Sequence, residues 1–79
     1  MEHEGDYFDF GWALTDLREG LSVSREGWNG PGQHVFLQSP DENSKITVPY
    51  LVIKTVQGDL VPWLPSQTDV LATDWYTVR

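Results

Sequence analysis

A glycine-rich segment, residues 25–32, carries the residue types that bind nucleotides. Arg25 can donate two hydrogen bonds to phosphate oxygens, Trp28 can stack on a base, and Asn29 can read a base edge or a ribose hydroxyl. Gly30 and its neighbouring glycines leave backbone N–H groups open to an anion. The structural alternative is a tight turn in which Trp28 fills the core and Arg25 pairs with an acid. The spacing alone leaves both interpretations open.

A second polar and aromatic segment lies at residues 61–69. Two prolines bracket Trp63 and lead to Ser66, where a helix start is expected, and the free N–H groups of a helix start favour an anion. Further donors and acceptors follow: Gln67, Thr68 and Asp69. The structural alternative is ordinary capping of that helix by Ser66 and Asp69. The two segments together favour a binding surface.

The residues that could catalyse a reaction form no recognisable set. His34 lies in a predicted strand with no nucleophile pattern beside it. Asp69 and Asp74 are a possible acid–base pair of the glycosidase kind, but such residues more often cap a helix or accept a ligand hydroxyl or a buried Trp N–H. The chain has no Cys and no phosphate-binding loop motif, and its two histidines are far apart in sequence. We therefore expect no catalytic residue, no metal and no cofactor.

One helix and several short strands must position these segments. A helix over residues 8–19 is predicted by four apolar residues at helical spacing: Phe10, Ala13, Leu14 and Leu17. Asp6 or Asp9 can cap its start and Gly20 its end. Strand composition or period-two alternation is found at residues 21–25, 34–38, 50–56, 60–63 and 75–78.

The connections between these elements indicate how they are arranged. A turn at residues 57–59 predicts a hairpin, and Pro62, which has no N–H, suggests that the returning strand lies at an edge. Ser66 begins a short helical turn, and residues 39–44 are an exposed connection. The prediction is a single α+β domain over residues 1–79, with residues 1–6 mobile. It has a small, mainly antiparallel sheet, one principal N-terminal helix and a short C-terminal helical turn.

Size and charge restrict the function further. The chain has 79 residues, a net charge of -7 and a pI near 4.4. A core of this size supplies only about 3–5 kcal/mol, and with no disulfide available we expect a homo-oligomer. The acidic balance argues against DNA or RNA as a partner, since phosphates are neutralised by clustered Lys and Arg. No apolar run reaches the length of a membrane span, so we expect a cytoplasmic protein with no membrane partner.

Five motifs in a fixed order carry a resemblance to a known family. They are F-G-x-A-L-x-x-L at residues 10–17, V-x-R-x-G-W-N-G at 23–30, P-Y-x-x-x-K-T-x-x-G at 49–58, V-P-W-L-x-S-Q-T-D at 61–69 and L-A-x-D-W at 71–75. This order resembles the Thoeris anti-defense 2 family of phage proteins over residues 8–78. The chain departs from the family pattern at Pro31, Gln33 and Pro65, where a basic residue, Met and Ala are expected.

The resemblance implies a function that composition cannot show. Members of this family act as sponges, which bind glycocyclic ADP-ribose made by a bacterial immune TIR enzyme and hold it without cleaving it. Some members also bind cyclic dinucleotides of the CBASS system at separate pockets. They are homotetramers with pockets shared between subunits, and the expected location is the cytoplasm of the infected bacterial host. The alternative is an acidic decoy that blocks a basic surface of a host defence protein, although the acidic residues here are scattered rather than arrayed.

The motifs that match the family define the predicted site. We expect one wall to be formed by Arg25, Trp28, Asn29 and Gly30, with Arg25 on a phosphate and Trp28 stacking on a base or ribose. We expect the opposite wall to be formed by Trp63, Gln67, Thr68, Asp69, Asp74 and Trp75. The sequence does not show which Trp residues lie in the core and which in the pocket.

Overall fold

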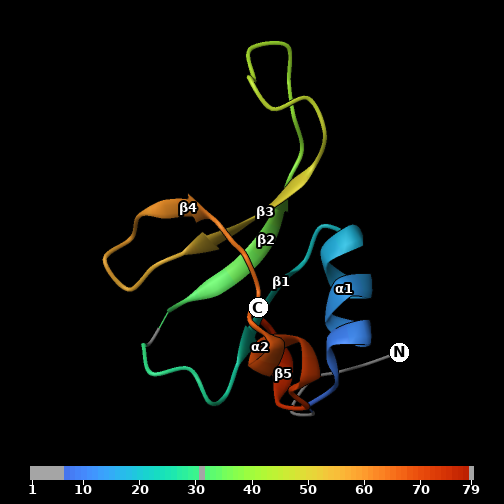
Figure 1. The fold of residues 1–79 in the computed structure, drawn as a ribbon, viewed down its shortest axis with the longest axis vertical. Helices are drawn as coiled ribbons and strands as arrows, with labels where there is room; N and C mark the ends of the chain where they lie inside the picture. The colour runs from blue at the N-terminus through green and yellow to red at the C-terminus, as the bar shows by residue number, and fades with distance from the viewer. Residues whose placement is uncertain (1–6, 31, 79) are drawn as a thin grey trace.

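The computed structural model describes residues 7–30 and 32–78, in two helices and five strands (Figure 1). The elements in chain order are α1 (Phe10–Arg18), β1 (Ser22–Arg25), β2 (His34–Gln38), β3 (Tyr50–Lys54), β4 (Leu60–Pro62), α2 (Gln67–Leu71) and β5 (Trp75–Val78). The α+β class, the principal N-terminal helix and the short second helix are confirmed. The predicted mobility of residues 1–6 and the possible cap at Asp6 lie outside the described residues.

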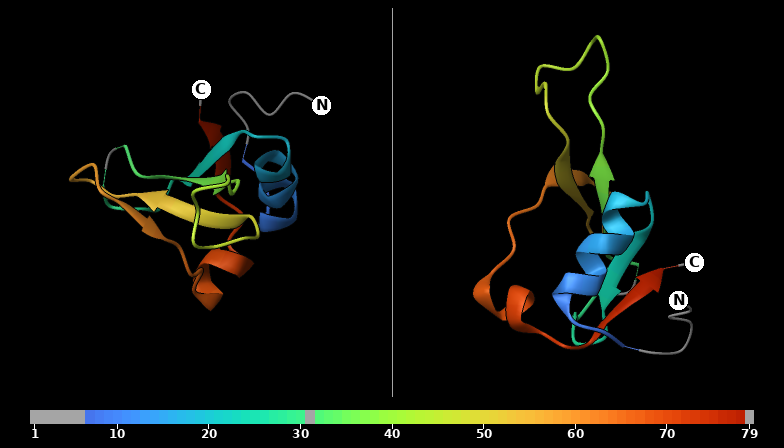
Figure 2. Two further views of the ribbon diagram at one scale, coloured as in Figure 1. Left: turned by 90° about the horizontal axis from the view of Figure 1, so that it is seen from above. Right: turned by 90° about the vertical axis from the view of Figure 1, so that its right-hand side faces the viewer.

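The five strands form one antiparallel sheet in the order β4-β3-β2-β1-β5. β2, β3 and β4 follow one another as a meander, and β5 then returns to the far side of the sheet, where it pairs with β1 (Figure 2). Pro62 lies in β4, an edge strand, as predicted. Its missing N–H therefore costs the sheet no internal hydrogen bond.

The helix α1 covers one face of the sheet and makes the core. Its side chains Ala13 and Leu17 are fully buried together with Val23, Val35 and Trp75 from the strands. The Asp9 carboxylate accepts a hydrogen bond from the Trp12 backbone N–H at 3.0 Å and begins the helix. Gly20, at φ +89°, ends it in the left-handed conformation that glycine adopts without strain.

Two predicted boundaries were wrong by two residues and three others by one, and the two larger differences arise because backbone hydrogen bonds outside the expected element take its place. The predicted helix began at Phe8, but Phe8 forms an isolated bridge with Trp75 and packs into the core. The predicted strand at residues 50–56 ends at Lys54 because Thr55 starts the hairpin turn. The Thr55 N–H donates to the Asp59 carbonyl, and the Gly58 N–H donates to the Thr55 carbonyl.

The sheet face opposite α1 is covered by neither helix within the described residues. Residues directly opposite each other on paired strands share a face, and Val35 and Ile53 lie on the core side. The alternate positions of β2, β3 and β4 therefore lie on the other side, which we call the open face: His34, Phe36, Gln38, Tyr50, Val52, Lys54, Leu60 and Pro62. Neither described helix is long and apolar enough to cross a bilayer.

Candidate functional site

Three of the four tryptophans gather in one aromatic cluster with Phe10. The ring centroids of Trp28 and Trp75 are 5.3 Å apart, those of Trp63 and Trp75 5.9 Å, and those of Trp28 and Trp63 6.2 Å, all edge to face. Trp75 is completely buried, whereas Trp28 and Trp63 are half-buried. The cluster therefore brings the glycine-rich segment and the segment after β4 to one place.

Arg25 lies beside this cluster and is held by two carboxylates. Its Nε donates to Asp74 Oδ1 at 2.7 Å, and its Nη1 donates to Asp69 Oδ1 at 2.9 Å. The side chains of Arg25 and Asp69 are each only 14% exposed. Arg25 therefore pairs with an acid, as in the structural alternative, and it pairs with two: Asp69 and Asp74.

Asp69 connects α2 to both the network and the cluster. Its carboxylate accepts hydrogen bonds from Trp28 Nε1 at 3.2 Å and from the Ser66 N–H at 3.1 Å, and its backbone carbonyl accepts from Trp75 Nε1 at 2.9 Å. The Ser66 side chain in turn accepts from the Asp69 N–H, which completes a capping box. The predicted cap at Ser66 is confirmed. The Asp69 carboxylate that completes this cap also accepts a hydrogen bond from Arg25.

Two glycines in the turn after β1 allow close packing. The Gly27 N–H donates to Asp74 Oδ2 at 2.8 Å, and a Cβ on Gly27 would come within 2.9 Å of the same oxygen. A Cβ on Gly30 would overlap the side chain of Val56 in the β3–β4 turn. Gly27 was not among the predicted site residues, although the R-x-G-W motif contains it. The ligand role predicted for Gly30 stays a prediction beside its packing role.

The network sets the charge of the site. Burial favours the neutral form of Asp69, but hydrogen bonds from the Ser66 N–H, the Arg25 guanidinium and the Trp28 indole outweigh it and lower the pKa of Asp69. The Arg25 guanidinium is the main cause that lowers the pKa of Asp74, partial burial opposes it, and the Gly27 N–H adds to the lowering. Both carboxyls are therefore ionised at neutral pH. A general acid needs a raised pKa, so the pair is unsuited to glycosidase chemistry.

Acid is expected to destabilise the protein through Asp69 and Asp74. Because folding lowers the pKa of both carboxyls, their contribution is complete above the unfolded-chain pKa of about 3.9 and is lost as pH falls through the lowered values. Urea titrations should give a nearly constant free energy of unfolding from about pH 7 to pH 5 and a decline below about pH 4.

A pair of variants identifies the carboxyls responsible for that decline. Asp74→Asn should make it shallower, while Glu42→Gln, in the exposed loop after β2, should leave it unchanged. An equally steep decline in Asp74→Asn and the parent would show that other carboxyls are responsible.

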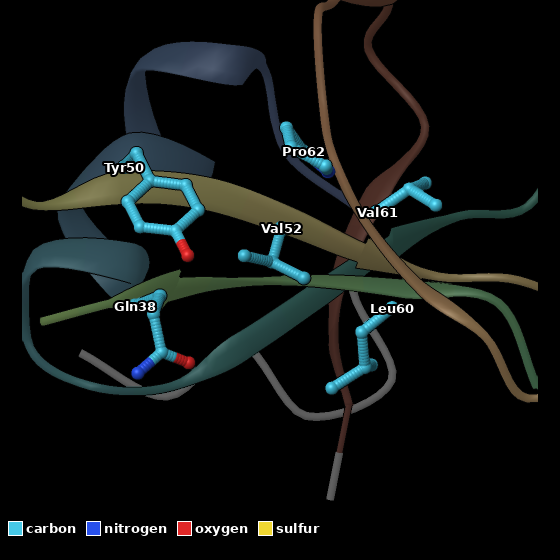
Figure 3. Close-up of a pocket in the computed structure, with 6 residues that line it drawn as sticks. All are labelled: Gln38, Tyr50, Val52, Leu60, Val61 and Pro62. Atoms are coloured by element: carbon cyan, nitrogen blue, oxygen red, sulfur yellow. The ribbon is translucent and has the colours of Figure 1, made fainter. Parts of the chain in front are cut away.

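The remaining predicted residues lie at the surface around the network. Asn29, Gln67 and Thr68 are exposed, and their predicted ligand contacts stay predictions. Two surface hollows lie elsewhere. One, of about 320 Å³, lies along α1 and is lined by Asp9, Gly11, Trp12 and Thr15. The other, of about 100 Å³, lies on the open face (Figure 3). None of the predicted site residues lines either hollow, and no group of three or more acidic or His residues suited to a metal occurs among the described residues.

Comparison of the sequence with known proteins identifies the family of this chain. Residues 8–78 match the sequence profile of the Thoeris anti-defense 2-like domain, a range that includes the cluster and the network. A protein of Bacillus phage SP01 named Thoeris anti-defense 2 is 39% identical, with 84% of this chain and 89% of that protein aligned. The chain therefore belongs to the Thoeris anti-defense 2 family.

Proposed function

We propose that this protein is a non-catalytic sponge that binds and sequesters glycocyclic ADP-ribose, with cyclic dinucleotides as further ligands, and so inhibits Thoeris defence. Family membership over residues 8–78 is the observation that carries the proposal, supported by the name of the phage relative. The action would take place in the cytoplasm of an infected bacterial cell, where the signal is made. A sponge acts by mass action, so it needs tight binding and no transition-state stabilisation.

The network and the cluster supply groups suited to such a ligand. The half-buried rings of Trp28 and Trp63 offer aromatic surface to a base, and two ionised carboxylates can accept hydrogen bonds from ribose hydroxyls or an exocyclic amine. Arg25 donates to both carboxylates, so its main role in this proposal is to hold them in place. Arg25, Asp69 and Asp74 together carry a formal charge of -1. Cations other than Arg25 must therefore balance the negative charge of the ligand phosphates.

We also propose that the protein works as a homo-oligomer, most simply a tetramer, with a site shared between subunits. Within the described residues, seven hydrophobic side chains are buried, whereas eleven large ones are exposed. A single chain therefore leaves much of its apolar surface in water, and association would cover part of it.

Recovery of the ligand tests the central claim. The protein is incubated with glycocyclic ADP-ribose and then heat-denatured, and the supernatant is analysed by mass spectrometry. We expect unchanged ligand in an amount that saturates at a fixed ratio to the protein. Hydrolysed product in excess over the protein would show turnover and contradict the sponge. The same assay with cyclic dinucleotides ranks the ligands.

Trp28→Ala tests the aromatic wall. Stacking contributes roughly 1–3 kcal/mol per base, so this variant should bind glycocyclic ADP-ribose about 5- to 150-fold more weakly in calorimetry. Trp12→Ala removes an indole from the outer side of α1 and should bind like the parent. Circular dichroism checks that both variants are folded. Parent-like binding by folded Trp28→Ala would place the ligand elsewhere.

A further inference from the structure

We infer that the open face of the sheet is the surface through which two copies of this chain associate. The inference rests on the self-association proposed above and assigns it to a particular surface. It is independent of which nucleotide the protein binds.

The open face carries apolar residues at positions where a sheet face in contact with water usually carries polar ones. Antiparallel sheets with one covered face normally place polar residues on the other. Here Phe36, Val52 and Pro62 lie directly opposite one another across β2, β3 and β4 and form an apolar row. Leu60, the neighbouring β4 residue on the same face and opposite Lys54, is 59% exposed. Pro62 is also exposed and Phe36 is half-buried, whereas Val52 between them is only 5% exposed. Water therefore contacts the apolar side chains on either side of Val52, and these have the composition of an interface core.

A hollow in this face has the size of a side chain. Figure 3 shows its lining residues, among them Gln38 from β2 and Tyr50 and Val52 from β3. Its volume is about 100 Å³, well below the roughly 300–1,000 Å³ of small-molecule sites. An apolar side chain from a protein surface fits it better than a nucleotide does.

The charge distribution favours a second copy as the occupant. The chain has twelve acidic residues and a net charge of -7, so most pairs of surfaces repel each other. None of the eight open-face positions is acidic, and Lys54 is the one Lys or Arg among them. Two copies that meet through this face keep their acidic groups in solvent.

The edges of the sheet offer poorer alternatives. Strand addition requires unpaired N–H and C=O groups in a row. At β4, Pro62 has no N–H to donate, and at β5 the N–H and C=O of Trp75 already pair with Phe8. Contact through a face needs neither edge.

Mass measurement of matched variants tests the assignment. Light scattering coupled to size exclusion is applied to the ligand-free parent, to Leu60→Glu and to Leu64→Glu. Leu64 is 90% exposed but lies outside the open face, so it controls for the added charge. We expect a parent mass that is a multiple of 9.0 kDa and a parent-like mass for Leu64→Glu. Leu60→Glu should associate about 10- to 100-fold more weakly, because the interface would lose an apolar side chain and would desolvate a carboxylate and the Lys54 ammonium opposite it.

Single cysteines give a second measurement that does not depend on how Leu60→Glu folds. The chain contains no Cys, so Gln38→Cys, on the open face, and Gln57→Cys, in the β3–β4 turn, each introduce one thiol. A short bismaleimide should link Gln38→Cys into dimers and leave Gln57→Cys largely monomeric.

The outcomes separate this inference from the proposed function. A parent of 9.0 kDa at micromolar concentration would overturn the inference, as would a folded Leu60→Glu with the parent mass. So would a Gln38→Cys variant that cross-links no more than Gln57→Cys. If a 9.0 kDa parent still bound glycocyclic ADP-ribose, the proposed sponge function would remain and only this interface would be rejected. An intact oligomer that bound no nucleotide would contradict the sponge alone.

Discussion

Replacing Trp75 with alanine is expected to unfold the chain. Its indole is fully buried, packs against Phe10, Trp28 and Trp63, and donates Nε1 to the Asp69 carbonyl. Loss of a buried Trp costs about 3–5 kcal/mol, which is the whole stability expected of a core this small. Circular dichroism of Trp75→Ala should show no cooperative thermal transition at a concentration where the parent melts cooperatively.

The matched control for this prediction is Trp12→Ala. Trp12 lies on the outer side of α1 and is 46% exposed, so its removal should lower the melting temperature by only a few degrees. A folded Trp75→Ala with nearly the parent melting temperature would show that the aromatic cluster is not the centre of stability.

Replacing Asp69 with alanine should have the second largest effect. One carboxylate accepts hydrogen bonds from Arg25, the Trp28 indole and the start of α2. Asp69→Ala therefore leaves Arg25 Nη1 and the Trp28 Nε1–H without this acceptor and removes half of the capping box, while Arg25 keeps its bond to Asp74. We expect a loss of about 2–4 kcal/mol, the sum of a helix cap and a charge-assisted hydrogen bond. Urea denaturation followed by Trp fluorescence measures the loss.

Two variants show which part of Asp69 matters. Asp69→Asn keeps an acceptor oxygen for the helix cap but removes the charge, so it should fall between the parent and Asp69→Ala. Thr68→Ala, at the adjacent exposed position of α2, should stay close to the parent. If Asp69→Ala and Thr68→Ala were equally stable, the network would contribute nothing measurable to the fold.

Local signals explain which parts of the fold were predictable. The cap at Ser66, the strands His34–Gln38 and Trp75–Val78 and the hairpin before Pro62 depend on neighbouring residues, and the structure has each of them. Phe8 was misplaced because its role depends on a bridge to Trp75, 67 residues along the chain. Contacts of that separation leave no period in the sequence.

The same limit applies to the site. The pairing of Arg25 with an acid was one of two open interpretations, but twelve acidic residues compete for the role and its two partners lie 44 and 49 residues away. Trp75 is buried and Trp28 is only half-buried, and this difference also depends on how α2 packs beside α1. Motif spacing shows that these residues belong together, and only the fold shows which contact which.

The position of β5 beside β1 has a consequence for how the chain folds. Trp75 pairs with Arg25 across 50 residues, whereas Val35 pairs with Val23 across 12. Closing the longer loop costs about 1.3 kcal/mol more chain entropy than closing the shorter one, so β1 can pair with β2 before it pairs with β5. During synthesis, the last strand emerges after every other element, and the Arg25 network and the aromatic cluster form only then. The nascent chain therefore completes its candidate site and its core in the same late step.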